Sequence, residues 1–425
     1  MRPWRTDRTA LRLAVALLIG LVVAAPPARG DPRPAIETGF SADGLKGVSD
    51  YFENEVSSDR IPGAVVLIQQ HGEPVYFKTF GQRDAAAHAP MTKDAIFRLY
   101  SMSKPITAVA AMMLVDDGKI ALHDPLSKYI PSFADVKVGV EQKDASGKAE
   151  LTLEPLQRPI TIEDLLRHTS GITYGFYGDG VVRRLYRSSG LFDGDFDNAQ
   201  FAARLAKLPL AEQPEAQWDY GHSSDVLGRV IEVVSERPLF QFEKQRLLDP
   251  LGMKDTGFFV PEAKRGRVAA FRPNGGFKRP IAGLDDPIQQ RRWESGGAGM
   301  DGTARDYARF AEMLLEGGAL DGRRYLKPQT VALMTSDRIG PETGIRRDGF
   351  YFPHRDSGFG LGFAVRTVAT RLLPAGEYGW DGVGGTFFFI DPRDDMFAIV
   401  MMQSPSQRGR IQTEVKKLIY EALRK

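Results

Sequence analysis

The 425-residue chain contains no cysteine. This absence excludes disulfide bridges, thiol nucleophiles, cysteine-bound metals and a lipid anchor attached to a cysteine. Histidine is scarce as well, with only 6 residues. No metal-ligand spacing relates these six, which are His71, His88, His123, His168, His222 and His354. We therefore expect no metal and no organic cofactor.

An excess of charge of one sign is also missing. The chain has 56 basic and 54 acidic residues, a formal net charge of +2. Proteins that bind nucleic acid through the phosphate backbone present a strongly basic surface. The balance of charges thus excludes a nucleic-acid partner and leaves a small molecule as the expected ligand.

Long apolar runs are absent except near the first residue. There, four arginines (Arg2, Arg5, Arg8 and Arg12) precede an apolar run at 13–25, and Ala28-Arg29-Gly30 follows it. This order is typical of a secretory signal peptide, and the run is short for a membrane span. We predict a signal peptide over residues 1–30, export to the periplasm or the medium, and no stable membrane insertion after cleavage. A retained membrane anchor is the alternative.

The remaining chain reads as strands at both ends around a helical middle. The predicted strands are 64–68, 75–80, 359–368, 377–380, 386–390 and 397–402. Helices are predicted over 45–57, 105–117, 162–168, 225–236, 239–248, 304–315 and 406–423. This order favours an α+β fold in which residues 31–100 and 345–425 form an antiparallel sheet flanked by helices. Residues 101–344 would form a mainly helical lobe, with a small hairpin near 136–153.

Ser101 and Lys104 form a Ser-x-x-Lys pair at the start of the apolar helix predicted over 105–117. Residues three apart in a first helical turn face the same way, so the amine lies near the hydroxyl. A serine becomes nucleophilic when a neighbouring base takes its proton, and lysine can do so when burial lowers the pKa of its amine. Taken alone, the pattern is common, and a surface position is the alternative interpretation.

Two later segments add polar and aromatic groups. Trp218-Asp219-Tyr220-Gly221-His222 precedes a predicted helix, and Trp380-Asp381-Gly382-Val383-Gly384 ends a predicted strand. Each also has a structural explanation, namely packing of the tyrosine and a tight turn at the glycines. We interpret His168 as a structural hydrogen-bonding residue. The aromatic residues of the next loop, Tyr174, Phe176 and Tyr177, either line a pocket or pack within their loop.

In this order, the three segments resemble those of the penicillin-recognising serine hydrolases. This superfamily holds the class C β-lactamases and the D-alanyl-D-alanine carboxypeptidases, and the chain is most similar to its family VIII carboxylesterases. Leu-Leu-Arg-His-Thr-Ser-Gly at 165–171 and Gly-Gly-Ala-Gly at 296–299 support the resemblance, which extends over most of residues 45–425. It implies the β-lactamase/DD-peptidase-like fold and agrees with the two-lobed α+β prediction.

The resemblance also implies a role for each matching residue. Ser101 would be the acylated nucleophile and Lys104 would hold or remove its proton. Tyr220 would relay a proton to the leaving group and then activate the deacylating water. The backbone N–H groups of Ser101 and Val383 would form the oxyanion hole. Trp380, Gly382 and His222 would lie beside a small ester or amide substrate.

Two departures from the family pattern bear on the substrate. His222 stands where β-lactamases have the asparagine of Tyr-x-Asn, and we expect it to pack or to hydrogen-bond near the site. Trp380 stands where many relatives carry a cation that holds a substrate carboxylate. An indole has one N–H donor and no charge, so the change favours neutral esters over β-lactams.

We therefore predict a serine hydrolase that cleaves small carboxylic esters through an acyl-enzyme. The same fold leaves β-lactamase, D-amino-acid peptidase and acyltransferase activities as alternatives. A non-catalytic binder of cell-wall fragments is the alternative from another class of protein.

Overall fold

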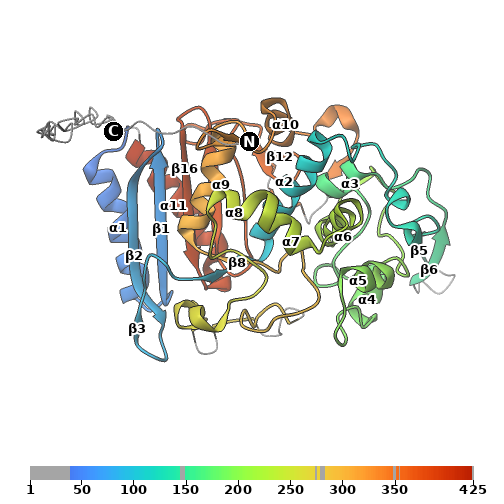
Figure 1. Cartoon of the computed structure of the whole chain (residues 1–425), viewed down its shortest axis with the longest axis horizontal. Coiled ribbons are helices and arrows are strands. Elements are labelled where there is room, and N and C mark those ends of the chain that lie inside the picture. Colours follow the sequence, from blue (N-terminus) through green and yellow to red (C-terminus); the bar gives the residue numbers. More distant parts are fainter. Residues whose placement is uncertain are drawn as a thin grey trace, which may run out of the picture. The chain divides into compact units, whose positions relative to one another are not determined.

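Strands from both ends of the chain pair in one eight-stranded antiparallel sheet (Figure 1). The computed structural model describes residues 39–143, 149–272, 275–277, 283–347, 351–353 and 355–423. The predicted signal peptide, the turn at 144–147 and His354 lie outside the described residues. In spatial order the sheet comprises β12 (Ser357–Phe359), β13 (Ala364–Arg366), β14 (Tyr378–Asp381), β15 (Phe387–Asp391), β16 (Met396–Met402), β1 (Gly63–Gln70), β2 (Glu73–Asp84) and β3 (Ala89–Pro90).

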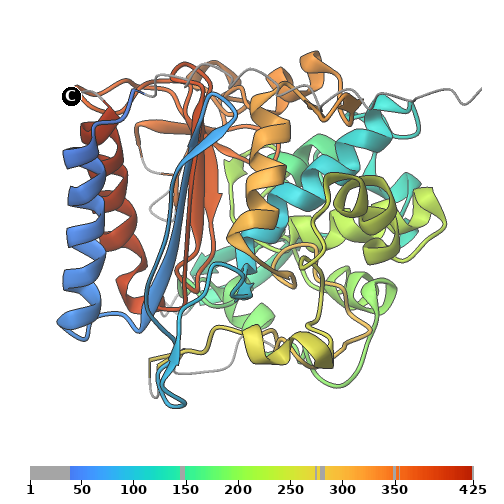
Figure 2. The same ribbon diagram turned by 60° about the vertical axis from the view of Figure 1, so that its left-hand side comes forward.

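The adjacent inner strands β16 and β1 are apolar on both faces. In β1, Val66 and Ile68 pack on one side of the sheet, whereas Val65 and Leu67 pack on the other. Successive side chains of a strand alternate between faces, so a continuous apolar run is buried from both sides. The sheet is accordingly covered twice, by α1 (Ala42–Ser57) and α11 (Arg408–Leu423) on one face and by α9 (Ala304–Leu315) on the other (Figure 2).

The helical region follows β4 (Phe97–Arg98), which pairs with β8 (Asp301–Gly302). Every residue from Met102 to Leu114 is buried, which makes α2 (Ser103–Asp116) a helix enclosed on all sides. It packs against α6 (Ser223–Ser235) and α7 (Leu239–Glu243). The same region also contains α3 (Ile162–Arg167), α4 (Val181–Ser188), α5 (Asn198–Leu205), α8 (Asp249–Leu251) and α10 (Pro328–Met334). The predicted hairpin is present as β5 (Val138–Lys143) paired with β6 (Ala149–Glu154).

The α+β fold with an antiparallel sheet from both chain ends is thus confirmed. All described residues belong to one compact unit, Thr38–Lys425, and the boundaries of the two predicted lobes stay a prediction. Among the described residues, no helix has the length and apolar character needed to cross a bilayer.

Two predicted elements were wrong in their extent. The strand predicted over 359–368 is split into β12 and β13, because the chain turns at Gly360–Gly362 and Gly362 adopts a φ of 97° that favours glycine. The helix predicted over 239–248 ends as α7 at Glu243 and continues as a wider π-type turn over Lys244–Leu248.

Candidate active site

Ser101 lies in a strained turn that joins β4 to α2. Residues Tyr100–Met102 form a single 3₁₀ turn, and Tyr100 adopts a φ of 46°, in the left-handed region that a bulky residue rarely occupies. The Tyr100 hydroxyl donates to Asp285 Oδ1 at 2.8 Å, which holds the turn from the side. Backbone strain of this kind persists only where surrounding contacts fix it, and it is concentrated at functional sites. The turn presents the Ser101 side chain to a cavity.

Lys104 lies one helical turn further on, and its side chain is almost fully buried. Its ammonium donates to Ser101 Oγ at 3.2 Å, to the Tyr174 hydroxyl at 3.2 Å and to the Gly297 carbonyl at 2.7 Å. The same Nζ lies 4.6 Å from the centre of the Tyr220 ring. Hydrogen bonds to neutral oxygens and an aromatic face partly replace the water lost on burial. The helical spacing therefore brings the two groups together as predicted.

Tyr220 reaches the same cavity from the segment between β7 (Gln217–Trp218) and α6. Its ring stacks on Trp218, with centroids 5.7 Å apart, and its hydroxyl accepts a hydrogen bond from Trp380 Nε1 at 3.1 Å. Lys104 thus lies over the Tyr220 ring, while the phenol bonded to its amine is that of Tyr174. Burial, followed by the negative charge of Asp225, raises the pKa of Tyr174 well above its ordinary value, so this second phenol is neutral at pH 7.

The glycine-rich turn after β14 supplies the opposite wall. Trp380 and Val383 line the cavity, whereas Gly382 lies behind it, where a Cβ would come within 2.2 Å of the Leu99 carbonyl oxygen. Among the described residues, the backbone N–H groups of Ser101 and Val383 have no hydrogen-bond partner. Two such donors at one cavity are what the stabilisation of an oxyanion requires.

The cavity itself measures about 1130 Å³ and is mostly aromatic on one side. Three phenylalanines that line the cavity are exposed to solvent, namely Phe176, Phe192 and Phe352. Few other large apolar side chains among the described residues are exposed. Tyr174 also lines the cavity. Tyr177 instead donates to Asp219 Oδ1 at 2.6 Å and bonds the Tyr220 carbonyl, so the loop-packing interpretation holds for that residue.

A buried carboxylate connects His222 with the backbone that holds Lys104. Asp225 accepts hydrogen bonds from His222 Nδ1 at 2.9 Å, Ser295 Oγ at 2.5 Å and the Gly297 N–H at 3.1 Å. Burial alone would raise the pKa of Asp225, but the hydrogen bond and the electrostatic attraction of His222, followed by the hydrogen bond from Ser295, outweigh it and leave the pKa below its ordinary value. Asp225 is therefore an anion that orients both His222 and the Gly297 peptide.

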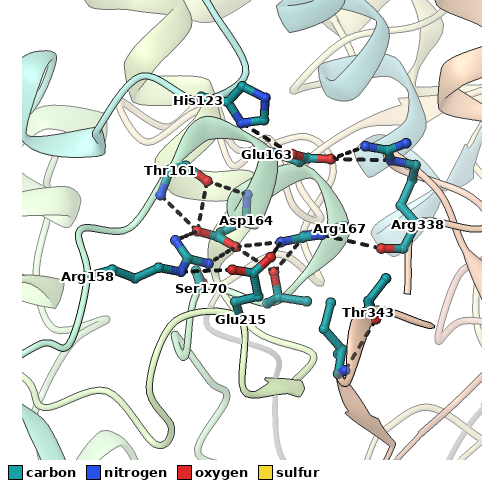
Figure 3. A network of polar contacts seen from close by, with 12 residues as sticks. His123, Arg158, Thr161, Glu163, Asp164, Arg167, Ser170, Glu215, Arg338 and Thr343 are labelled. Carbon is teal, nitrogen blue, oxygen red and sulfur yellow. Dashed lines mark hydrogen bonds and ion pairs between the residues drawn. The ribbon is translucent and has the colours of Figure 1, made fainter. Parts of the chain in front are cut away.

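A network of ion pairs joins α3 to the segment that contains Glu215 (Figure 3). Asp164 receives both guanidinium nitrogens of Arg158 at 2.8 Å, and Arg167 bridges Asp164 and Glu215. This network fixes the end of α3 and the segment after it, whose carbonyls at His168 and Thr169 accept from the Asp219 and Glu215 N–H groups. The segment that carries Tyr220 is thereby tied to the end of α3, through the hydrogen bond from the Asp219 N–H to the His168 carbonyl.

The interpretation of His168 as a hydrogen-bonding residue was wrong for its side chain. Its ring packs against Tyr220 with centroids 4.8 Å apart, and Nδ1 has no partner among the described residues. Burial, followed by the charge of Lys104, holds the pKa of His168 well below its ordinary value, so the imidazole is neutral. It acts as an aromatic packing residue behind the tyrosine.

The sequence did not single out Tyr174, Asp225, Ser295 or Gly297 as parts of one network. Only the spacing of His222 and Asp225 was readable, since residues three apart at a helix start face the same way. The other contacts depend on loop conformation. Among the described residues, no cluster of His, Asp and Glu side chains is suited to hold a metal ion.

Comparison with known proteins gives a consistent result. Residues 48–421 match the family model described as Beta-lactamase. An uncharacterised Mycobacterium tuberculosis protein is 36% identical over 355 residues, which are 81% of this chain and 86% of that protein. Esterase EstB of Burkholderia gladioli is 33% identical over 362 residues, covering 80% of this chain and 85% of the esterase. The solved structure of EstCE1, a hydrolase with promiscuous acyltransferase activity, superposes with a TM-score of 0.74 at 27% identity, covering 90% of this chain and 98% of that one.

The resemblance inferred from the three motifs is thereby confirmed. The protein belongs to the β-lactamase family, as a hydrolase or acyltransferase that has the β-lactamase fold.

Proposed function

We propose that this protein is a carboxylesterase that cleaves carboxylic esters through an acyl-enzyme on Ser101. The observation that carries the proposal is the 3.2 Å contact between Lys104 Nζ and Ser101 Oγ at the wall of a cavity. A nucleophile and a base within hydrogen-bond reach, beside an open cavity, are the minimum requirement for acyl transfer.

The three partners of Lys104 also accommodate the neutral amine that the proposed base requires. Such an amine has two N–H groups and one lone pair. The Gly297 carbonyl can only accept and the Tyr174 hydroxyl can accept, which leaves the lone pair for the Ser101 proton. Serine oxygen then attacks the ester carbonyl, and the unpartnered N–H groups of Ser101 and Val383 stabilise the oxyanion. Tyr220, whose hydroxyl is held by Trp380, would give its own phenolic proton to the departing alcohol. Lys104 would then return the Ser101 proton to the phenolate, and Tyr220 would later activate water.

Neutral esters suit the cavity better than substrates with a carboxylate beside the reacting carbonyl. At β14, the cavity wall is the indole of Trp380, which has no charge. The cations at the far end of the cavity, Arg366, Arg408 and Lys416, are each paired with a carboxylate of Asp356, Asp381 or Glu377. A cation whose charge is already neutralised by a carboxylate has little attraction for an anionic substrate.

Acyl transfer to an alcohol is the second candidate, because the cavity is larger than a small ester needs. Ligand pockets of roughly 300–1,000 Å³ enclose drug-sized molecules, so a cavity of about 1130 Å³ can hold an acyl group and a bulky alcohol together. The description of EstCE1 as a hydrolase with acyltransferase activity supports this candidate.

The proposal is tested with p-nitrophenyl esters of increasing chain length, nitrocefin and D-Ala-D-Ala peptides. We expect hydrolysis of the esters to exceed that of the other two, and Ser101→Ala to abolish it while the circular dichroism spectrum stays unchanged. Near wild-type turnover by that variant would refute the role of Ser101. Absence of any adduct with a fluorophosphonate would favour a non-catalytic binder, and an added alcohol acceptor would separate transfer from hydrolysis. Export to the periplasm or the medium stays a prediction, which cell fractionation would test.

A further inference from the structure

His222 is enclosed by aromatic rings at one end of the cavity. Its ring centroid lies 4.4 Å from that of Tyr174, 5.2 Å from that of Phe201 and 5.5 Å from that of Phe192. Only 5% of its side chain is exposed, and His222 is one of the residues that line the cavity. A polar group in apolar surroundings has a large influence on what binds there, because leaving it unpaired is unfavourable.

Asp225 determines which ring nitrogen carries the proton. A carboxylate can only accept, so His222 Nδ1, at 2.9 Å, must be the nitrogen that donates. In a neutral imidazole, the other nitrogen, Nε2, is then a bare acceptor. Asp225 also receives Ser295 Oγ and the Gly297 N–H, so it is fixed in place and cannot turn to accept from elsewhere.

Nε2 has no hydrogen-bond partner among the residues that the structure describes. It is also not one of the side-chain nitrogens that are sealed from solvent without a partner, as His168 Nδ1 is. Nε2 therefore keeps some exposure, and His222 lines the cavity that contains Ser101. The asparagine of Tyr-x-Asn could offer an N–H group at this position, whereas a neutral histidine oriented by Asp225 cannot.

We propose that His222 is a specificity-determining residue whose Nε2 accepts a hydrogen bond from the substrate, so that the enzyme prefers esters bearing an O–H or N–H donor on the acyl group. This inference rests on the proposed esterase function and deepens it by naming the substrate class. An apolar acyl group would leave Nε2 buried and unpaired, whereas a hydroxyacyl or acylamino group would satisfy it.

The test uses two esters that differ only in the donor, p-nitrophenyl 3-hydroxybutanoate and p-nitrophenyl 3-methoxybutanoate. Methylation keeps the oxygen, removes its proton and adds a methyl group, so the change in the ratio of the two kcat/KM values between wild type and His222→Phe reports the donated hydrogen bond. We expect the wild-type ratio to be about 10 or more in favour of the hydroxy ester.

His222→Phe keeps a ring of similar size and removes the acceptor, so its ratio should fall to about 1. The ratio is measured within each variant, which cancels any loss of folded protein or of the shared chemical step. His123→Phe is the matched control, because that side chain is 87% exposed, and its ratio should equal that of the wild type.

A wild-type ratio near 1, or a ratio that survives in His222→Phe, overturns the inference while ester hydrolysis itself continues. If neither ester is hydrolysed and Ser101 is not acylated, the proposed function fails, and the inference fails with it. The two failures are thus distinguished by whether turnover is present.

Discussion

Two buried charges in this protein are stabilised in opposite ways. Asp164 in α3 is 0% exposed and is surrounded by the guanidinium groups of Arg158 and Arg167 and by threonine hydroxyls. Lys104 in α2 is 2% exposed, yet its hydrogen bonds go to a serine, a phenol and a carbonyl. Among the described residues, no carboxylate lies within ion-pair distance of its amine.

This difference explains why the charge of Asp164 stabilises the fold, whereas the amine of Lys104 is suited to act as a base. Removing the charge of a fully paired group leaves its charged partners without compensation, which is strongly unfavourable when they are buried. A charge held by neutral dipoles can be lost without stranding an opposite charge. The proposed proton exchange between Lys104 and Ser101 is compatible with this arrangement, whereas Asp164 holds Arg158 and Arg167 beside α3 (Figure 3).

The largest effect on stability should come from breaking the paired charge. We expect Asp164→Ala to lower the free energy of unfolding by about 3–5 kcal/mol, because Arg158 and Arg167 lose their shared partner. Asp50→Ala is the matched control, since it breaks the exposed Lys46–Asp50 pair and should leave the free energy of unfolding nearly unchanged. Urea denaturation measures both. Equal losses would contradict the contrast between the two charges.

Removing the charge of Lys104 should lower the activity and leave the stability intact. Lys104→Met and Tyr220→Phe should each lower ester kcat/KM by at least about 100-fold, the scale of general acid–base contributions. Lys104→Met should leave the unfolding free energy unchanged or increase it, since an apolar chain replaces a buried cation. Lys46→Met, at an exposed position, serves as the control for activity. A large loss of stability in Lys104→Met would show that this lysine is structural.

Acid should weaken the paired site. Burial tends to raise the pKa of Asp164, but the bonds from Arg158 and Thr161 outweigh this and lower the pKa below its ordinary value. A carboxyl group with a lowered pKa stabilises the fold above its unfolded pKa of about 4, and this contribution is lost as the pH falls further. The unfolding free energy of wild type should therefore fall below about pH 4. In Asp164→Asn the fall should be shallower, and identical slopes would argue against the assignment.

The smallest effect should come from the hydrogen bond between Trp380 and Tyr220. Trp380→Phe keeps an aromatic wall and removes the N–H donor that holds the tyrosine hydroxyl. A hydrogen bond contributes about 1 kcal/mol, so kcat should fall about fivefold while KM changes little. Steady-state kinetics with one short ester measures both kcat and KM. A rise in KM with unchanged kcat would place Trp380 in substrate binding alone.

The parts of the fold and site that depend on local patterns were predictable from the sequence. The continuous apolar runs at 64–68 and 397–402 predicted the central strands, and the three-residue spacing of Ser101 and Lys104 predicted their contact. Contacts between distant loops were not predictable. Tyr174 meets Lys104 across 70 positions, and Gly297 meets Asp225 across 72, through loops without periodicity. The split at Gly360–Gly362 was signalled only by two glycines within an apolar segment.

The central claim is that Ser101 carries the acyl group during turnover. The most direct measurement is intact-mass spectrometry of the protein quenched in acid during ester hydrolysis, followed by peptide mapping. We expect a mass increase equal to one acyl group, located on the peptide that contains Ser101 and absent in Ser101→Ala. Turnover without an adduct, or an adduct on another residue, would contradict the account.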